Sequence, residues 1–198
     1  MGIDWQHMSE ADKFKAVYKR NIKRYGADGL LKNLELRGFF EAPASTKYHG
    51  AYPGGLVEHS NNVFRWLFQI ATAADCERNR DKEPEEQTAQ FSVETLAIVA
   101  LLHDVCKMDE YHRDETGIYK RYTDFPFGHG EKSVILITQY MDLTPEEMLA
   151  IRWHMGGFDH ATKGGCYDMN SAYNKTKLAP MLHIADMAAT HLTEGAAQ

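Results

Sequence analysis

The longest apolar run of the chain, Leu96–Leu102, is unbroken over seven residues and is followed directly by polar residues. Its alanine and leucine content favours helix, and the lack of a polar position predicts a helix that is buried on every side. Ser92 stands where the N-cap of such a helix is expected. The run ends on His103 and Asp104. An ionised carboxylate at the end of a buried helix costs several kcal/mol unless a partner compensates its charge.

Other segments carry the helical period of apolar residues. Residues 9–25 predict an amphipathic helix that ends at Gly26 and buries Phe14, Val17, Tyr18, Ile22 and Tyr25. Thr144 begins a capping box with Pro145 at the first helical position. The remaining helices are expected over 28–37, 56–74, 131–140, 144–154 and 178–192, with the central helix beginning at Ser92.

Four stretches lack that helical period: three predict loops or irregular structure, and the fourth predicts strands. Residues 39–55 are rich in proline, glycine and aromatic residues and predict an ordered loop, whereas 77–90 predict an exposed charged connector. Residues 156–176 are glycine-rich and predict irregular structure. Residues 110–123 are rich in Tyr, Ile and Thr around Glu115-Thr116-Gly117, which indicates a β-hairpin. The pattern therefore predicts an all-α bundle with one small hairpin.

Composition narrows the class of protein. The 198 residues suit one domain. The net charge of −6 argues against a general nucleic-acid coating function, and no apolar run is long enough to span a membrane. Cys76, Cys106 and Cys166 are far apart, form no CxxC motif and accompany no signal peptide, so we expect a cytoplasmic protein. Ten histidines are a high count and the first indication of a metal site.

Six polar residues lie on or at the ends of the predicted apolar helices: His59, His103, Asp104, His129, His154 and Asp186. Helices of a bundle face one another along their apolar sides, so ligands on separate helices can converge in the core. Imidazole and carboxylate are ligands for Mn, Fe, Co, Ni and Zn alike. The sequence therefore predicts a divalent metal centre without fixing which metal it binds.

The order H…HD…H…H…D, with intervals of 26, 25 and 32 residues after His103, resembles the HD-domain superfamily of metal-dependent phosphohydrolases. The lead-in FFEAPA at 39–44 and HGAYPGGLVEHS at 49–60, the HDxxK motif at 103–107 and the GH at 128–129 are most similar to the HD domain of bacterial 3′→5′ exoribonucleases. This resemblance implies an HD domain over 39–198, with 1–38 as a helical extension packed on it.

The resemblance also implies the role of each residue. Asp104 would bridge two cations, with His59, His103 and Asp186 completing one coordination sphere and His129 and His154 the other. Two cations about 3.5–4 Å apart can share a hydroxide that attacks phosphorus. Lys107 is a candidate catalytic residue that would bind a phosphate oxygen; alternatively it is an exposed lysine at a helix C-terminus. Glu58 would orient His59 or be solvated.

The chain departs from related patterns at three places. Residues 1–38 leave no room for the OB fold that precedes the exoribonuclease domain, which weakens the case for a polynucleotide substrate. Cys106 stands where many HD proteins have glycine. In the related HD-GYP family, a second histidine follows the position of His154 and a glutamate precedes that of His59 by one turn; here Met155 and Gly55 occupy them. We therefore expect two metals at most.

The expected function is hydrolysis of a phosphomonoester or phosphodiester of a nucleotide or short oligonucleotide, with a small-molecule phosphate ester as the partner. Two alternatives stay open. The basic residues of 13–24 could bind short single-stranded RNA for a 3′→5′ exoribonuclease, or the site could bind a nucleotide as a non-catalytic sensor. The ligand types alone also leave an HD-like oxidase open. His49, in the loop before His59, is a candidate substrate contact.

Overall fold

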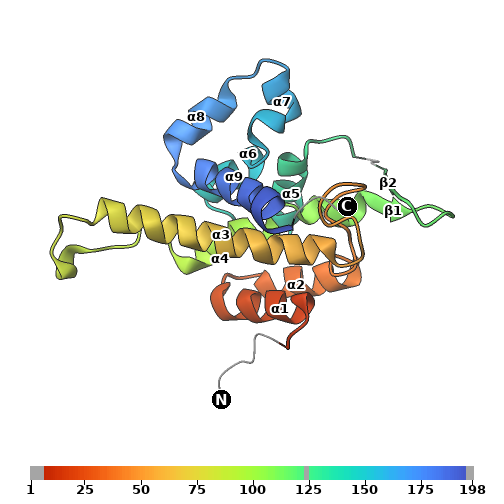
Figure 1. Ribbon diagram of the computed structural model, residues 1–198, viewed down its shortest axis with the longest axis horizontal. Helices are drawn as coiled ribbons and strands as arrows, with labels where there is room; N and C mark the ends of the chain where they lie inside the picture. The colour runs from red at the N-terminus through yellow and green to blue at the C-terminus, as the bar shows by residue number, and fades with distance from the viewer. Residues whose placement is uncertain (1–6, 123–124, 195–198) are drawn as a thin grey trace.

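The computed structural model describes residues 7–122 and 125–194, and Figure 1 shows its arrangement. Its helices and strands follow in chain order: α1 (Glu10–Asn21), α2 (Ala27–Leu36), α3 (Gly55–Arg78), η1 (Pro84–Glu86), α4 (Val93–Leu102), η2 (Val105–Asp109), β1 (Tyr111–Arg113), β2 (Tyr119–Arg121), α5 (His129–Thr138), α6 (Pro145–Trp153), η3 (Gly156–Phe158), α7 (His160–Lys163), α8 (Asp168–Lys175), α9 (Leu178–Ala188) and the π-helix η4 (Ala189–Glu194). The prediction of a helical bundle with one hairpin is confirmed.

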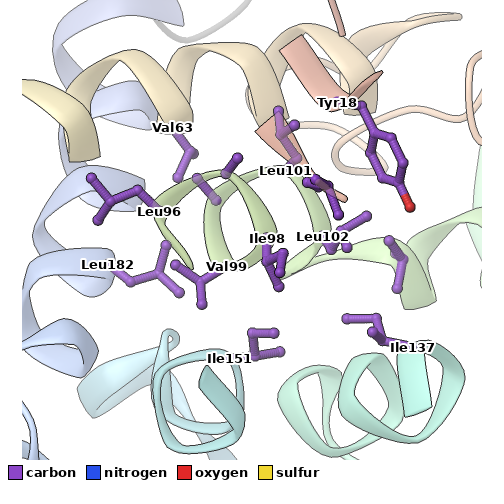
Figure 2. Close-up of a cluster of buried hydrophobic side chains, with 14 of the residues drawn as sticks. Tyr18, Val63, Leu96, Ile98, Val99, Leu101, Leu102, Ile137, Ile151 and Leu182 are labelled. Atoms are coloured by element: carbon purple, nitrogen blue, oxygen red, sulfur yellow. The ribbon is translucent and has the colours of Figure 1, made fainter. Parts of the chain in front are cut away.

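Helix α4 lies at the centre of the core. Ser92 caps it by accepting a hydrogen bond from the Thr95 amide, and all seven residues of its apolar run are buried. Figure 2 shows its side chains meeting those of α1, α3, α5, α6 and α9; the labelled residues are Tyr18, Val63, Leu96, Ile98, Val99, Leu101, Leu102, Ile137, Ile151 and Leu182. Burial of one such side chain contributes about 1.5–3 kcal/mol, so α4 is held from several sides.

Helices α1 and α2 lie together on one side of α3 and α4, and α5 to α9 lie on the other (Figure 1). The segment 7–38 is thus a helical layer packed on the bundle; the domain boundary between residues 38 and 39 stays a prediction. None of the helices in the described ranges is long and apolar enough to cross a membrane.

The first helix is shorter than its apolar pattern predicted. α1 ends at Asn21, and the predicted core residue Tyr25 is 96% exposed. Tertiary contacts explain the early end: the Lys23 amide donates to Glu94 Oε1 at 2.6 Å. Beyond it, the Arg24 guanidinium forms two hydrogen bonds with the buried carboxylate of Glu147. These contacts draw the chain out of the helical path.

The glycine-rich stretch 156–176 is more ordered than predicted, because η3, α7 and α8 occupy most of it. Asp159 caps α7 by accepting hydrogen bonds from the amides of Ala161 and Thr162. The charged connector also differs, since α3 continues to Arg78 and η1 lies within 77–90. The hairpin is confirmed, with Tyr111 opposite Arg121; Thr123, the last residue predicted for it, lies outside the described residues.

Candidate metal centre

His103 and His154 occupy equivalent positions at the C-terminal ends of two neighbouring core helices. Each is the C-cap of its helix, α4 or α6, and each is fully buried. His103 Nδ1 donates to the Ala100 carbonyl at 2.9 Å, and His154 Nδ1 donates to the Ile151 carbonyl at 2.7 Å. A carbonyl oxygen only accepts, so Nδ1 carries the proton and Nε2 is left with its lone pair.

His59 shows the same arrangement with a different acceptor. It lies in the second turn of α3, and its Nδ1 faces both carboxylate oxygens of Glu194 at 3.1 Å. Metal-binding histidines usually donate their second ring N–H to such an oxygen, which fixes the orientation of the ring. The rings of His59 and His154 both lie close to the ring of His103. Their centroids are 5.3 Å and 4.8 Å, respectively, from the His103 centroid.

The three Nε2 atoms converge on Asp104, the first residue after His103. Asp104 Oδ2 lies 3.4 Å from His103 Nε2 and 4.0 Å from His59 Nε2, whereas Oδ1 lies 3.4 Å from His154 Nε2. Asp186 on α9 adds a second carboxylate, 3.2 Å from His59 Nε2. The two oxygens of Asp104 therefore face different histidines.

Four buried atoms of this cluster make no hydrogen bond: Nε2 of His59, His103 and His154, and Asp104 Oδ1. An unsatisfied buried polar atom costs about 1–3 kcal/mol, so four of them close together need an explanation. A divalent cation supplies one, because nitrogen and oxygen lone pairs at these separations are its ligands. Two candidate ligand triplets result, His59-His103-Asp104 and His103-His154-Asp186. The donor set fits the predicted divalent metal.

Lys107 is buried and lies against Asp104. Its Nζ is 2.6 Å from Asp104 Oδ2, across the first turn of η2. Burial opposes ionisation of Asp104, but Lys107 and His103 outweigh it and hold the pKa of this carboxyl well below its ordinary value. The alternative of an exposed lysine at a helix end is wrong, because the 3-10 turn after His103 directs the side chain inward.

The carboxylates around His59 create a strongly negative environment. Burial by itself lowers the pKa of His59, but Asp186 and Glu194 outweigh it and raise the pKa to about 9. The pKa of Asp186 is correspondingly below its usual range, because His59 and its neighbours outweigh the burial of the carboxyl. The carboxylates of Asp186 and Glu194 therefore favour a positive charge at this end of the site.

His129, the first residue of α5, has partners other than these carboxylates. Its Nδ1 is 3.3 Å from Cys106 Sγ and 3.7 Å from Glu110 Oε2. Burial lowers the pKa of His129 to about 4, so the ring is neutral and able to donate a lone pair. Asp104, Cys106 and His129 form a further candidate ligand triplet.

A cavity of about 640 Å³ opens beside the cluster and gives it access to a ligand. Its walls include Asp104, Asp186 and Lys107. His49 also lines it, with a buried Nε2 that has no hydrogen-bond partner, and burial lowers the pKa of this ring to about 4. The remaining lining residues are Tyr48, Met155, Phe158, Lys163, His183, Met187, Thr190 and His191. The volume is within the range of small-molecule sites.

His183 binds the backbone of His154. Its Nδ1 lies 2.7 Å from the His154 carbonyl oxygen, which accepts the hydrogen bond. Gly156, with φ of 56°, makes room for the His183 ring, because a Cβ at this position would come within 2.4 Å of it. Two residues after the C-cap of α6, the chain therefore has a glycine that a larger residue could not replace without moving the site.

Glu194 is the site residue that the sequence did not reveal. It is separated from His59 by 135 positions and follows no motif. Glu58, which the sequence offered as the partner of His59, instead accepts a hydrogen bond from the Tyr52 hydroxyl at 2.8 Å. Adjacent residues of a helix point in different directions, so Glu58 does not face the ring of His59.

Comparisons with known proteins agree with this geometry. A model of the HD domain family matches residues 56–190. The chain is 32% identical over 89 residues to a dihydroneopterin 2′,3′-cyclic phosphate phosphodiesterase of Methanocaldococcus jannaschii, a match that covers 45% of this chain and 32% of that protein. The chain thus spans about a third of that curated relative. No solved structure matches significantly.

The family match covers more than half of the chain and includes all six predicted ligand positions. HD domains bind divalent metals, in agreement with the donor set described above. The chain therefore belongs to the HD domain family, which confirms the predicted membership of the HD-domain superfamily.

Proposed function

We propose that the protein is a metal-dependent phosphohydrolase that cleaves a phosphomonoester or phosphodiester of a nucleotide or short oligonucleotide. The residues that would hold its cations are His59, His103, Asp104, His129, His154 and Asp186. One observation carries this proposal: three histidine lone pairs and an oxygen of Asp104, all buried and unsatisfied, meet beside a cavity of about 640 Å³.

Asp104 would be the central ligand of this site. Its Oδ1 faces His154, and its Oδ2 faces His59 and His103, so the two oxygens point to different ligand sets, as a bridging carboxylate requires. Bound cations would polarise the phosphate and generate a nucleophile from water near neutral pH. The protein supplies the geometry: helix ends fix each imidazole ring, and the surrounding core keeps water out.

Lys107 would contact the phosphate, and His49 would contact a neighbouring hydroxyl or water. Lys107 is a fixed positive charge at the wall of the cavity, suited to a non-bridging phosphate oxygen whose charge grows during the reaction. His49 presents an unpartnered Nε2 to the same region, where a substrate hydroxyl or water can donate to it. Lys107 is buried and His49 is half-buried, so little water has to leave either side chain before it can act.

The outer part of the cavity suits an aromatic base. Tyr48 and Phe158 line it and are 65% and 55% exposed, and Lys163 lies over the Phe158 ring with Nζ 5.8 Å from its centroid. Exposed aromatic rings next to a phosphate site are typical platforms for stacking a nucleobase or a similar heterocycle. The curated relative is named as a phosphodiesterase of dihydroneopterin 2′,3′-cyclic phosphate, so nucleoside 2′,3′-cyclic phosphates are the first substrates to test.

The exoribonuclease alternative receives less support. Three of the basic residues in 13–24 pair with carboxylates: Lys13 with Glu10, Lys15 with Glu35, and Arg24 with Glu147. None of the residues of 13–24 lines the cavity described above. The charge that this segment offers to RNA is therefore lower than its sequence indicates, and a small nucleotide is the preferred substrate.

The test combines metal analysis with activity. Protein purified with Mn²⁺ or Fe²⁺ should contain stoichiometric metal and hydrolyse bis-p-nitrophenyl phosphate and at least one nucleoside cyclic phosphate. The Asp104→Ala variant should lose both the metal and the activity. His112→Ala is the matched control, because His112 is an exposed histidine outside the cluster and its loss should change neither.

Three results would overturn the proposal. Unchanged hydrolysis by Asp104→Ala would remove the metal centre from the reaction. Tight nucleotide binding by metal-loaded protein, without product over hours, would favour the non-catalytic sensor. Salt-sensitive degradation of single-stranded RNA that depends on Lys19 and Lys23 would instead favour the exoribonuclease.

A further inference from the structure

Cys106 occupies a position in the centre that the proposed function leaves unused. It is the second residue after Asp104 and lies in η2, fully buried. Burial raises the pKa of this thiol, so it is no free nucleophile. The ring of His129 nevertheless lies directly beside it. A buried sulfur next to a metal centre needs its own explanation.

The geometry around Cys106 is that of a ligand set. One ligand atom each of Asp104, Cys106 and His129 lies within 4.8 Å of the other two. Cys106 Sγ and His129 Nδ1 are 3.3 Å apart. Tetrahedral zinc sites have Zn–S bonds of about 2.3 Å and Zn–N bonds of about 2.0–2.1 Å, which place the sulfur and nitrogen about 3.5 Å from each other. The observed separation is close to this value.

Asp104, which this triplet shares with the cluster of His59, His103 and His154, is the member of the triplet that has an unsatisfied buried atom. Its side chain is 2% exposed, and its Oδ1 has no hydrogen-bond partner. Glu110, the other carboxylate near His129, is already occupied: Arg121 Nε donates to its Oε2 at 2.8 Å, and Lys132 Nζ lies 3.4 Å from its Oε1. Among the described acidic and sulfur groups close to His129, Cys106 is therefore the one without a competing charged partner.

We infer that Cys106 is a thiolate ligand of the second cation, which it binds together with His129 and the bridging Asp104. This inference rests on the two-cation form of the proposed function. On binding, the thiol proton is released to solvent and a sulfur lone pair forms the bond to the metal. Sulfur is a softer ligand than oxygen, so this site takes Zn²⁺, Fe²⁺ or Co²⁺ in preference to Mg²⁺ or Mn²⁺.

The test uses Co²⁺ as a spectroscopic probe of sulfur ligation. Metal-free protein is titrated with cobalt chloride, and a near-ultraviolet sulfur-to-cobalt charge-transfer band is expected to appear with the second equivalent. The band should persist in Cys76→Ser and Cys166→Ser, whose cysteines lie outside the candidate ligand triplets. It should be absent from Cys106→Ser and Cys106→Ala, while the first equivalent of cobalt still binds.

Affinity provides a second readout. Loss of a partner that merely orients a ligand costs about 10–100-fold in metal affinity, so loss of a ligand should weaken the second Zn²⁺ by at least about tenfold. Mn²⁺ binding should change much less, because manganese gains little from sulfur. Circular dichroism of the metal-free variants establishes that each one is folded. If either Cys106→Ser or Cys106→Ala does not fold, the other variant still provides the test.

The outcomes separate this inference from the proposed function. Two bound cobalt ions without a charge-transfer band would overturn the thiolate ligand and leave Cys106 as a hydrogen-bond partner of the His129 ring, with the hydrolase proposal intact. A band that survives in Cys106→Ser would also overturn it. Failure to bind any cobalt would contradict the inference and the metal-dependent function together.

Discussion

Glu194 holds the ring of His59 in place, with both of its carboxylate oxygens 3.1 Å from Nδ1. Asn62 Nδ2 donates to Glu194 Oε1 at 2.9 Å and fixes the carboxylate in turn. Glu194 is the last residue of η4 and lies beyond the segment 56–190 that matches the HD domain family. Glu194, at the C-terminal end of the described residues, therefore orients His59, the residue of the candidate metal centre that lies on α3.

The first prediction concerns this carboxylate. Glu194→Ala should weaken binding of divalent metal by about 10–100-fold, because the His59 ring loses the acceptor that orients it. Glu194→Gln should lose less, since the amide oxygen can still accept from Nδ1. Competition with a chromophoric chelator measures both affinities.

Thr193→Val is the control for this experiment. It removes the hydrogen bond from Trp66 Nε1 to Thr193 Oγ1, which anchors the same turn to α3 at 2.8 Å. Metal affinity should be unchanged in this variant. Equal losses in Thr193→Val and Glu194→Ala would mean that η4 acts only by packing.

The second prediction concerns the buried pair of Lys107 and Asp104. Lys107→Met removes the cation that lies 2.6 Å from Asp104 Oδ2 and leaves the carboxylate without its nearest positive partner. Breaking a buried pair in this way costs about 3–5 kcal/mol, and we expect a loss of this size in the metal-free protein. Bound Mn²⁺ should offset most of it, because the cation then compensates Asp104.

Urea unfolding of wild type and variant, each with and without Mn²⁺, measures the effect. The added stability from Mn²⁺ should be larger in Lys107→Met than in wild type. The same Mn²⁺ effect in both proteins would show that the cation and Lys107 do not share Asp104. Hydrolysis should also fall in the variant, since the fixed charge at the cavity wall is lost.

The third prediction concerns Arg24, which joins the N-terminal layer to α6. Its guanidinium donates to both oxygens of Glu147 at 2.6 and 2.9 Å, and the Glu147 side chain is fully buried. Arg24→Met leaves that carboxylate unpaired and should lower the free energy of unfolding by about 3–5 kcal/mol. Lys15→Met breaks the more exposed pair with Glu35 and should change stability little.

Denaturant melts of the two variants test this comparison. A loss in Arg24→Met no larger than in Lys15→Met would mean that the buried pair contributes no more than a surface one. Metal affinity serves as a second readout, and it should be unchanged in Lys15→Met, which lies in α1 outside the candidate ligand triplets.

The fourth prediction concerns the core around α4. Leu101 is fully buried, and Leu101→Ala should lower the free energy of unfolding by about 2–5 kcal/mol, because it leaves a cavity in close-packed surroundings. Leu36 is 76% exposed at the end of α2, so Leu36→Ala should stay within about 0.5 kcal/mol of wild type. Chemical denaturation measures the difference, and similar losses in both variants would contradict the central position of α4.

Local sequence was sufficient for the elements whose causes are local. The apolar run 96–102 could only be buried, Ser92 and Thr144 mark the helix starts by their own hydrogen bonds, and Gly117 marks the hairpin turn. The order and types of the six candidate ligands were also legible, because metal chemistry restricts ligands to a few side chains. Tyr25 was misplaced, since contacts with α4 and α6 rather than its own pattern end α1.

The sequence by itself determined the bundle class, the hairpin, the family resemblance and the kinds of atoms at the centre. Only the tertiary structure decided which of those atoms meet, that Glu194 rather than Glu58 supports His59, that Lys107 is buried against Asp104, and that Cys106 faces His129. The physical reason is separation along the chain. Helix and turn signals act over three or four residues, whereas the partners of His59 and His129 come from other helices, brought together by the burial of α4.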